Sequence, residues 1–199
     1  MTTPFPYKRL GAFYLVFFAV LGVLAPYWGP YLQSRGFNAA EIGTLIALLH
    51  GTKIIAPNLW GWVADRTGAR MRIIRFACVI ALVGFAGVLL PGGFAWMALV
   101  MVAFSFFWNA ALPQFEANTL SHLGTQTHTY PRIRLWGTVG FMLAVLGVGE
   151  AIDRASVAIV PGVLLSLFAV LVLISFSVPQ AERDDRAMAN DSLGSVLLQ

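Results

Sequence analysis

The sequence predicts an all-α polytopic membrane protein with six transmembrane helices, and three observations support this fold class. Of the 199 residues, 58% are hydrophobic and only 11% are charged, and the mean hydropathy is +0.76. Soluble domains contain roughly 45–50% apolar and about 25% charged residues. The apolar residues form six long runs that lack the polar and apolar alternation of a membrane β-strand. Because backbone in lipid must satisfy its own hydrogen bonds, each run is predicted to be a helix.

Each run is close to the roughly 20 residues that cross a hydrocarbon core at about 1.5 Å per residue. The first follows Lys8 and Arg9 and could pass for a secretory signal. It is longer than an h-region of about 7–15 residues and no A-x-A site follows, so we expect a retained helix. The predicted helices span residues 10–32, 42–64, 73–90, 94–120, 133–149 and 157–178, and form one bundle over residues 1–179.

The basic residues predict the orientation, because short cytoplasmic loops are enriched in Lys and Arg. With a cytoplasmic N-terminus, only Arg35 and Arg154 fall outside. We therefore expect a multi-pass protein of the plasma (inner) membrane with both termini cytoplasmic. The net charge of +4 does not indicate nucleic acid as a partner, because the basic residues lie at the ends of apolar runs. The single cysteine, Cys78, lies inside an apolar run and can form no internal disulfide.

The break between the second and third predicted helices is the most informative segment. Residues 61–72, hereafter the charged segment, read GWVADRTGARMR and follow the pattern G-x-x-x-D-R-x-G-x-R-x-R. Its arginines require water at the membrane edge. The pattern is carried by Gly61, Asp65, Arg66, Gly68 and Arg70. It resembles the signature loop of the major facilitator superfamily of transporters, and the resemblance implies that this loop gates the change between outward-open and inward-open states. The simpler alternative is a loop that only sets topology.

Two further groups of ionisable residues lie inside apolar runs. His50 and Lys53 share one face of the second predicted helix, and Lys53 is too deep to reach the interface easily. Lys53 must therefore face a polar cavity, pair with an acid or be neutral. In the fourth helix, Asn109 and Glu116 are seven residues apart and nearly superpose in projection. Arg134 follows across a short turn, so Glu116 and Arg134 are expected to meet, either at a functional site or in a purely structural ion pair.

A closer resemblance rests on the fourth and fifth predicted helices. Their pattern is similar to that of lactose-permease-type and phenylpropionate-permease-like proton symporters, and comprises Asn109, Ala110, Pro113, Glu116, Arg132, Arg134, Gly137, Val139 and Gly140. The resemblance implies that Glu116 and Arg134 bind substrate. A sugar-stacking tryptophan of that family falls at Phe141, which weakens a sugar assignment because phenylalanine lacks an indole donor. Tyr27 and Trp28, between two prolines of the first helix, belong either to an interfacial aromatic belt or to the cavity.

The resemblance implies a secondary active transporter, proton-coupled, that moves a small organic solute by alternating access. The basic residues favour an organic anion such as an aromatic carboxylate; a sugar or nucleoside symporter and a non-transporting truncated fragment are the alternatives. Residues 180–199 are interpreted as a cytoplasmic central linker and the start of a truncated seventh helix, so a C-terminal six-helix half is an expected partner besides lipid, solute and proton. We expect no cofactor and no metal. An enzyme is not expected, because Ser105 and Ser166 lie outside protease motifs and DRTGAR supplies one aspartate where a metal-dependent transferase needs several.

Overall fold

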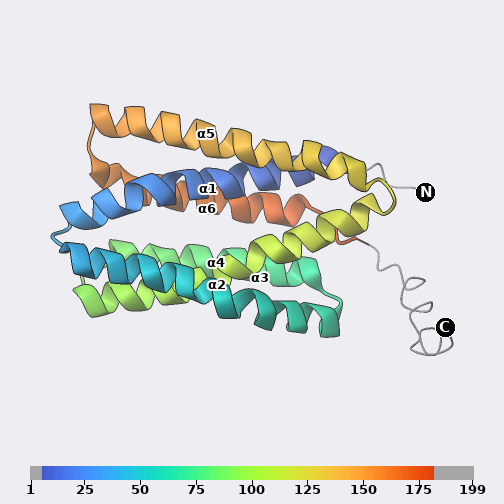
Figure 1. Ribbon diagram of the computed structural model, residues 1–199, viewed down its shortest axis with the longest axis horizontal. Coiled ribbons are helices and arrows are strands. Elements are labelled where there is room, and N and C mark those ends of the chain that lie inside the picture. The colour runs from blue at the N-terminus through green and yellow to red at the C-terminus, as the bar shows by residue number, and fades with distance from the viewer. Residues whose placement is uncertain (1–5, 182–199) are drawn as a thin grey trace, which may run out of the picture.

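The computed structural model describes residues 6–181, which form six long helices packed side by side (Figure 1). All six are long and apolar enough to cross a membrane. No strand occurs in this part of the chain, which confirms the all-α prediction. The long helices are α1 (Tyr7–Ser34), α2 (Ala39–Thr67), α3 (Arg70–Ala86), α4 (Phe94–Leu123), α5 (Tyr130–Arg154) and α6 (Val160–Ser177), with short 3-10 turns η1 (Gly87–Leu89), η2 (Thr127–Thr129) and η3 (Val157–Ile159).

Most helices run further than the apolar runs that predicted them. The apolar run measures the hydrocarbon thickness, whereas a helix continues into water until a capping residue ends it. Asn38 and Glu41 form a capping box that starts α2 before residue 42. The end of α5 extends beyond residue 149, where Arg154 pairs with Glu150 at 2.7 Å. The predicted linker after residue 181 lies outside the described residues.

The helices form two groups of three, α1 with α5 and α6, and α2 with α3 and α4 (Figure 1). The most extensive contacts are α1/α5, α3/α4, α2/α4 and α1/α6, and α3/α6 joins the groups. The contacts are symmetric when α1 is paired with α4, α2 with α5 and α3 with α6. The α1/α5 contact then corresponds to α4/α2, and the α1/α6 contact corresponds to α4/α3. Equivalent helices are three positions apart in chain order, and successive spans alternate in direction, so equivalent helices run in opposite directions. The bundle therefore has the arrangement of an inverted three-helix repeat.

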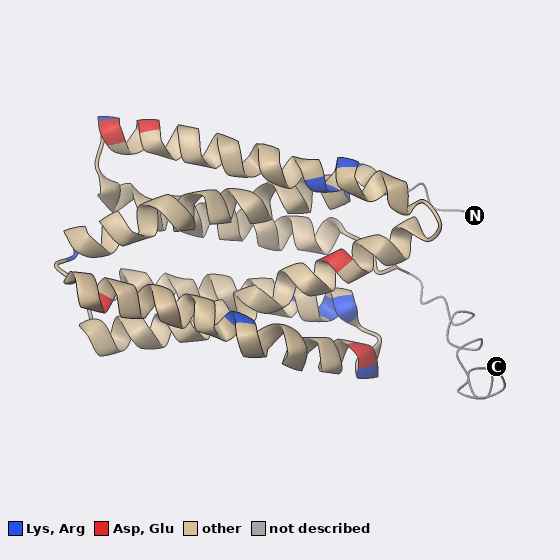
Figure 2. Cartoon of the chain, viewed as in Figure 1, with Lys and Arg blue, Asp and Glu red and all other residues tan. Residues whose placement is uncertain are grey.

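Glycines allow α1 and α5 to approach closely. A Cβ at Gly140 would overlap the backbone carbonyl of Leu15, and one at Gly22 would lie 2.6 Å from the carbonyl oxygen of Phe141. Stacked aromatic rings fill the wider space between α1 and α4, where the ring centroids of Phe17 and Trp108 are 3.9 Å apart. Figure 2 shows most charged residues at the two ends of the bundle and few along its middle.

Candidate functional site

The structure brings Glu116 of α4 and Arg134 of α5 together, with Arg134 Nε 3.5 Å from Glu116 Oε1. Each side chain keeps about a third of its surface exposed, 34% for Glu116 and 32% for Arg134, so the pair is open on one side. The Arg134 guanidinium lies over the Phe18 ring of α1, with its carbon 3.9 Å from the ring centroid. Helices α1, α4 and α5 therefore build one site that holds a cation and an anion in contact and accessible.

Two aromatic residues of this site were not predicted from the sequence. Phe18 and Tyr14 of α1 both face the Arg134 guanidinium, Tyr14 at 5.4 Å. In a helix that is apolar on all sides, nothing in the sequence shows which aromatic residue faces the cavity. Gly137 keeps this space open, because a Cβ there would lie 2.8 Å from the Phe18 ring and 3.0 Å from an Arg134 nitrogen.

Lys53 lies at a separate position, in the wall of a pocket between α1, α2 and α4. The pocket has a volume of about 150 Å³, and His50, Trp28 and Trp108 line it together with Lys53. Lys53 forms no ion pair with any acidic residue in the range 6–181. Of the environments expected for Lys53, the structure shows a cavity wall, but the cavity is mostly apolar and not the polar one expected.

Asn109 does not join the ion pair, because its amide is engaged between α2 and α4. The amide nitrogen donates to Thr52 Oγ1 at 2.7 Å and to the Leu49 carbonyl oxygen at 3.2 Å. The Thr52 hydroxyl in turn contacts the Ser105 hydroxyl at 2.9 Å. We call Thr52, Ser105 and Asn109 the polar clasp. Its two hydroxyl residues were missed in the sequence, where single Ser and Thr residues inside apolar runs give little signal.

The remaining aromatic candidates differ in their surroundings. The Tyr27 hydroxyl donates to the Val145 carbonyl oxygen at 2.6 Å, which ties α1 to α5. Trp28 is only 2% exposed and stacks on Tyr31, although one side of it reaches the Lys53 pocket. Phe141 is 36% exposed on α5. Tyr27 and Trp28 thus both have packing contacts, whereas Phe141 is exposed.

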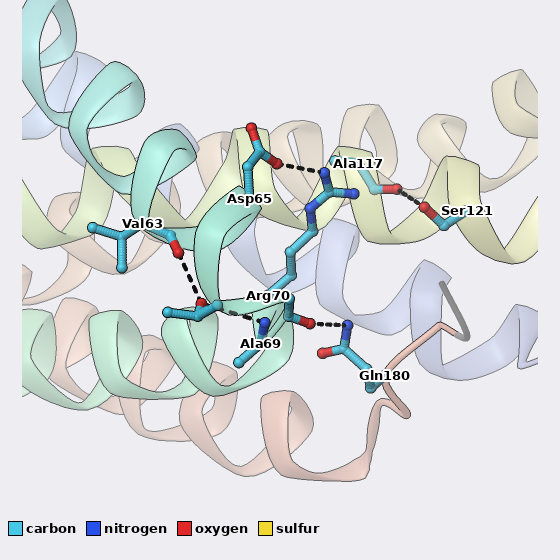
Figure 3. A network of polar contacts seen from close by, with 9 residues as sticks. Val63, Asp65, Ala69, Arg70, Ala117, Ser121 and Gln180 are labelled. Atoms are coloured by element: carbon cyan, nitrogen blue, oxygen red, sulfur yellow. Dashed lines mark hydrogen bonds and ion pairs between the residues drawn. The ribbon is translucent and has the colours of Figure 1, made fainter. Parts of the chain in front are cut away.

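The charged segment forms a tight junction between α2 and α3 (Figure 3). Asp65 and Arg70 pair at 2.9 Å across it. Gly68 ends α2 with a φ of 65°, a conformation that favours glycine, and its N–H donates to the Ala64 carbonyl oxygen at 2.8 Å. The Arg66 guanidinium lies 4.0 Å from the centroid of the Trp62 ring. A Cβ at Gly61 would make an ordinary van der Waals contact, because it would lie 3.5 Å from Gln114 Nε2.

The end of α6 is fastened to this junction by side chains that the sequence did not reveal. Gln180 accepts a hydrogen bond from the Met71 N–H at 2.8 Å. Its amide nitrogen donates to the Gly68 carbonyl oxygen at 3.3 Å (Figure 3). Arg75 of α3 donates to the carbonyl oxygens of Ser175 and Val178 at 3.2 and 2.9 Å. These contacts satisfy carbonyls that the helix end leaves without partners.

Comparison with known proteins identifies the family and relatives of this chain. It matches the model of the MFS_1 like family over residues 7–194. The maltose permease of Geobacillus stearothermophilus is 32% identical over 149 residues, which cover 74% of this chain and 38% of that protein. The probable 3-phenylpropionic acid transporter of Escherichia coli (strain K12) is 25% identical over 190 residues, covering 91% of this chain and 48% of that protein.

A solved structure shares the fold. The crystal structure of nucleoside transporter NupG superposes with a TM-score of 0.82 at 23% sequence identity, covering 96% of this chain and 48% of that chain. The chain thus spans half or less of the length of these relatives. The two matches to curated transporters and this fold confirm the resemblance on which the sequence analysis relied. The chain belongs to the MFS_1 like family, within the major facilitator superfamily of membrane transporters.

Proposed function

We propose that this six-helix unit is the N-terminal half of a secondary active transporter that moves a small organic solute by alternating access. Two six-helix halves related by an axis along the membrane normal, with a site at the midplane between them, are the architecture of this superfamily. The relatives are about twice as long as the chain, which supports a second six-helix unit as its partner. The observation that carries the proposal is the partly exposed Glu116–Arg134 pair, because ionisable residues at membrane depth are costly and mark functional sites.

Proton coupling is proposed to act through Glu116. It is the acidic residue that lies inside a span and contacts a cation of a neighbouring helix. Protonation of Glu116 removes its negative charge, so the positive charge of Arg134 is no longer compensated and favours the entry of an anionic solute into the cavity. Binding of the proton and of the solute would then favour each other, and such coupling is reciprocal.

The proposed solute is an organic anion, such as an aromatic carboxylate. Lys53 supports an anion, because its ammonium lies in a pocket wall without an acidic partner in residues 6–181. The apolar lining of this pocket and the exposed Phe141 offer surface for an aromatic body. A relative named as a probable 3-phenylpropionic acid transporter supports the same class. Maltose and nucleoside permeases among the relatives keep a sugar or nucleoside symporter as the alternative.

We further propose that the charged segment controls the change of state. The Asp65–Arg70 pair and the Arg66–Trp62 contact lie at one end of the bundle and can be made or broken without unfolding a helix. The distribution of Lys and Arg supports a cytoplasmic location for this end and for both termini, in the plasma (inner) membrane.

The test is uptake of 3-phenylpropionate into vesicles that contain the complete transporter, driven by an imposed pH gradient. Lys53→Ala should abolish uptake without reducing the amount of protein in the membrane, whereas Lys8→Ala should leave uptake unchanged. Unchanged affinity in Lys53→Ala would remove Lys53 from the site. Uptake insensitive to the gradient would contradict proton coupling. Saturable accumulation by the 199-residue chain alone would contradict both the need for a second half and the alternative of a non-transporting fragment. No uptake of 3-phenylpropionate by the complete protein would contradict the proposed solute.

A further inference from the structure

We propose that the pocket between α1, α2 and α4 is the slot that receives the aromatic ring of the solute, with Lys53 binding its carboxylate. We call this pocket the indole slot, after Trp28 and Trp108. The inference rests on the proposed function and adds which surface recognises which part of the solute. It assigns ring recognition to α1, α2 and α4 instead of to Phe141 on α5.

The size of the slot matches one ring. Its volume is about 150 Å³, and an apolar cavity of about 150 Å³ holds benzene. Its lining is mostly apolar and comes from Leu21, Leu24, Ala25, Trp28, Ile46 and Leu49 on α1 and α2, closed by Trp108 on α4. A ring with one carboxylate fits such a lining better than a polyhydroxylated solute, whose hydroxyls would find few partners there.

The indoles are fixed in position before a solute arrives. Trp108 stacks on Phe17 with an interplanar angle of 4° and is 2% exposed. Trp28 is held by Tyr31 and Phe85, with ring centroids 5.1 and 5.3 Å away. A binding surface that is already ordered loses little conformational entropy when the solute binds.

The charge at the slot completes the recognition. Lys53 and His50 line it from one face of α2, three residues apart. Across the bundle, Arg134 already has Glu116 as partner, whereas Lys53 has no acidic partner within residues 6–181. The uncompensated cation therefore lies beside the ring-sized cavity, which is the arrangement an aryl carboxylate requires.

The experiment compares two carboxylates that differ in the ring. Dissociation constants of 3-phenylpropionate and propionate are measured on the purified complete transporter. Ala25 lies in the slot lining and is exposed, so Ala25→Phe fills the slot without a clash in the core. We expect Ala25→Phe to weaken 3-phenylpropionate at least about tenfold and to leave propionate within about twofold. Lys53→Ala should weaken both acids alike. Gly162→Phe adds the same ring on α6, where a side chain meets open space, and should change neither constant.

Three other outcomes would contradict the slot assignment, and one of them would also contradict the proposed solute class. If Ala25→Phe weakens both acids equally, or neither, the slot does not bind the ring. If Phe141→Ala removes the preference for 3-phenylpropionate while Ala25→Phe keeps it, the ring stacks on α5 and the inference is overturned. Both results leave the proposed transport of anions intact. If the wild-type protein binds neither acid, the proposed solute class and the slot assignment fail together.

Discussion

The α1/α5 and α2/α4 contacts occupy equivalent places in the inverted repeat, yet different chemistry holds each together. At α1/α5, Gly22 and Gly140 let the backbones touch, and the Tyr27 hydroxyl adds a hydrogen bond to the Val145 carbonyl oxygen. At α2/α4, the polar clasp joins the helices through side-chain hydrogen bonds. Lipid tails are as apolar as Leu, so helices in a bilayer associate through close packing or hydrogen bonds. The two equivalent contacts thus use close packing and hydrogen bonds to different extents, and only the glycine contact at α1/α5 fixes the distance between the helix backbones.

The largest effect is expected at the backbone contact. Gly140→Ala places a methyl group against the Leu15 carbonyl, where neither backbone can yield, so α1 and α5 must separate. We expect a loss of about 3 kcal/mol in unfolding free energy, the upper end for overpacking. Thermal unfolding in detergent measures it. Gly147→Ala on the same helix meets open space and should be neutral or slightly stabilising. Equal stability of both variants would show that the glycine contact does not define α1/α5.

A smaller loss is expected from the polar clasp. Asn109→Ala removes the bonds to Thr52 and to the Leu49 carbonyl. The cost should be about 1–2 kcal/mol, because each hydrogen bond contributes about 1 kcal/mol net. Asn58→Ala is the matched control, because among residues 6–181 the Asn58 amide bonds to the Ile54 carbonyl of its own helix alone. This variant should change the unfolding free energy by less than about 0.5 kcal/mol. If Asn109→Ala lowers the unfolding free energy as much as Gly140→Ala does, the α2/α4 contact depends on its hydrogen bonds as strongly as the α1/α5 contact depends on its glycines.

A double-mutant cycle isolates the hydroxyl pair of the clasp. Thr52→Val and Ser105→Ala together should show a coupling of about 0.6 kcal/mol, the average for interhelical hydrogen bonds in a membrane. Thr67→Val combined with Ser105→Ala should show no coupling, because within residues 6–181 the Thr67 hydroxyl bonds to the Val63 carbonyl oxygen and the Ala69 N–H and not to Ser105. Zero coupling in the first pair would mean that Asn109 alone holds the clasp.

The smallest effect on stability is expected at Gly61, a glycine of α2 that lies beside Gln114 of α4. A Cβ there would make an ordinary contact at 3.5 Å, so Gly61→Ala should change the unfolding free energy by less than about 0.5 kcal/mol. If the charged segment gates transport, uptake should nevertheless fall sharply in this variant. A destabilisation comparable to that of Gly140→Ala would show that α2/α4 also depends on close backbone approach.

Hydropathy sufficed to predict the helical fold, because spanning a membrane requires long apolar segments. The meeting of Glu116 and Arg134 also followed from the sequence, since a short turn brings facing helix ends together. Helix rotation could not be predicted, because helices that are apolar all round do not reveal which face is buried. Asn109 shows this limit. It shares a face with Glu116 in projection but lies about 10 Å away along α4, where α2 is its neighbour.

Gln180 has a mechanical consequence. Its side chain bonds to Met71 and Gly68, and Arg75 holds the carbonyls just before it, so the polypeptide leaves α6 tethered to the start of α3. Asn118 of α4 holds the same segment, since it accepts from the Ala181 N–H and donates to the Pro179 carbonyl oxygen. Displacement of the chain that follows α6 would therefore act on α4 through Asn118 and on the Asp65–Arg70 junction through Gln180.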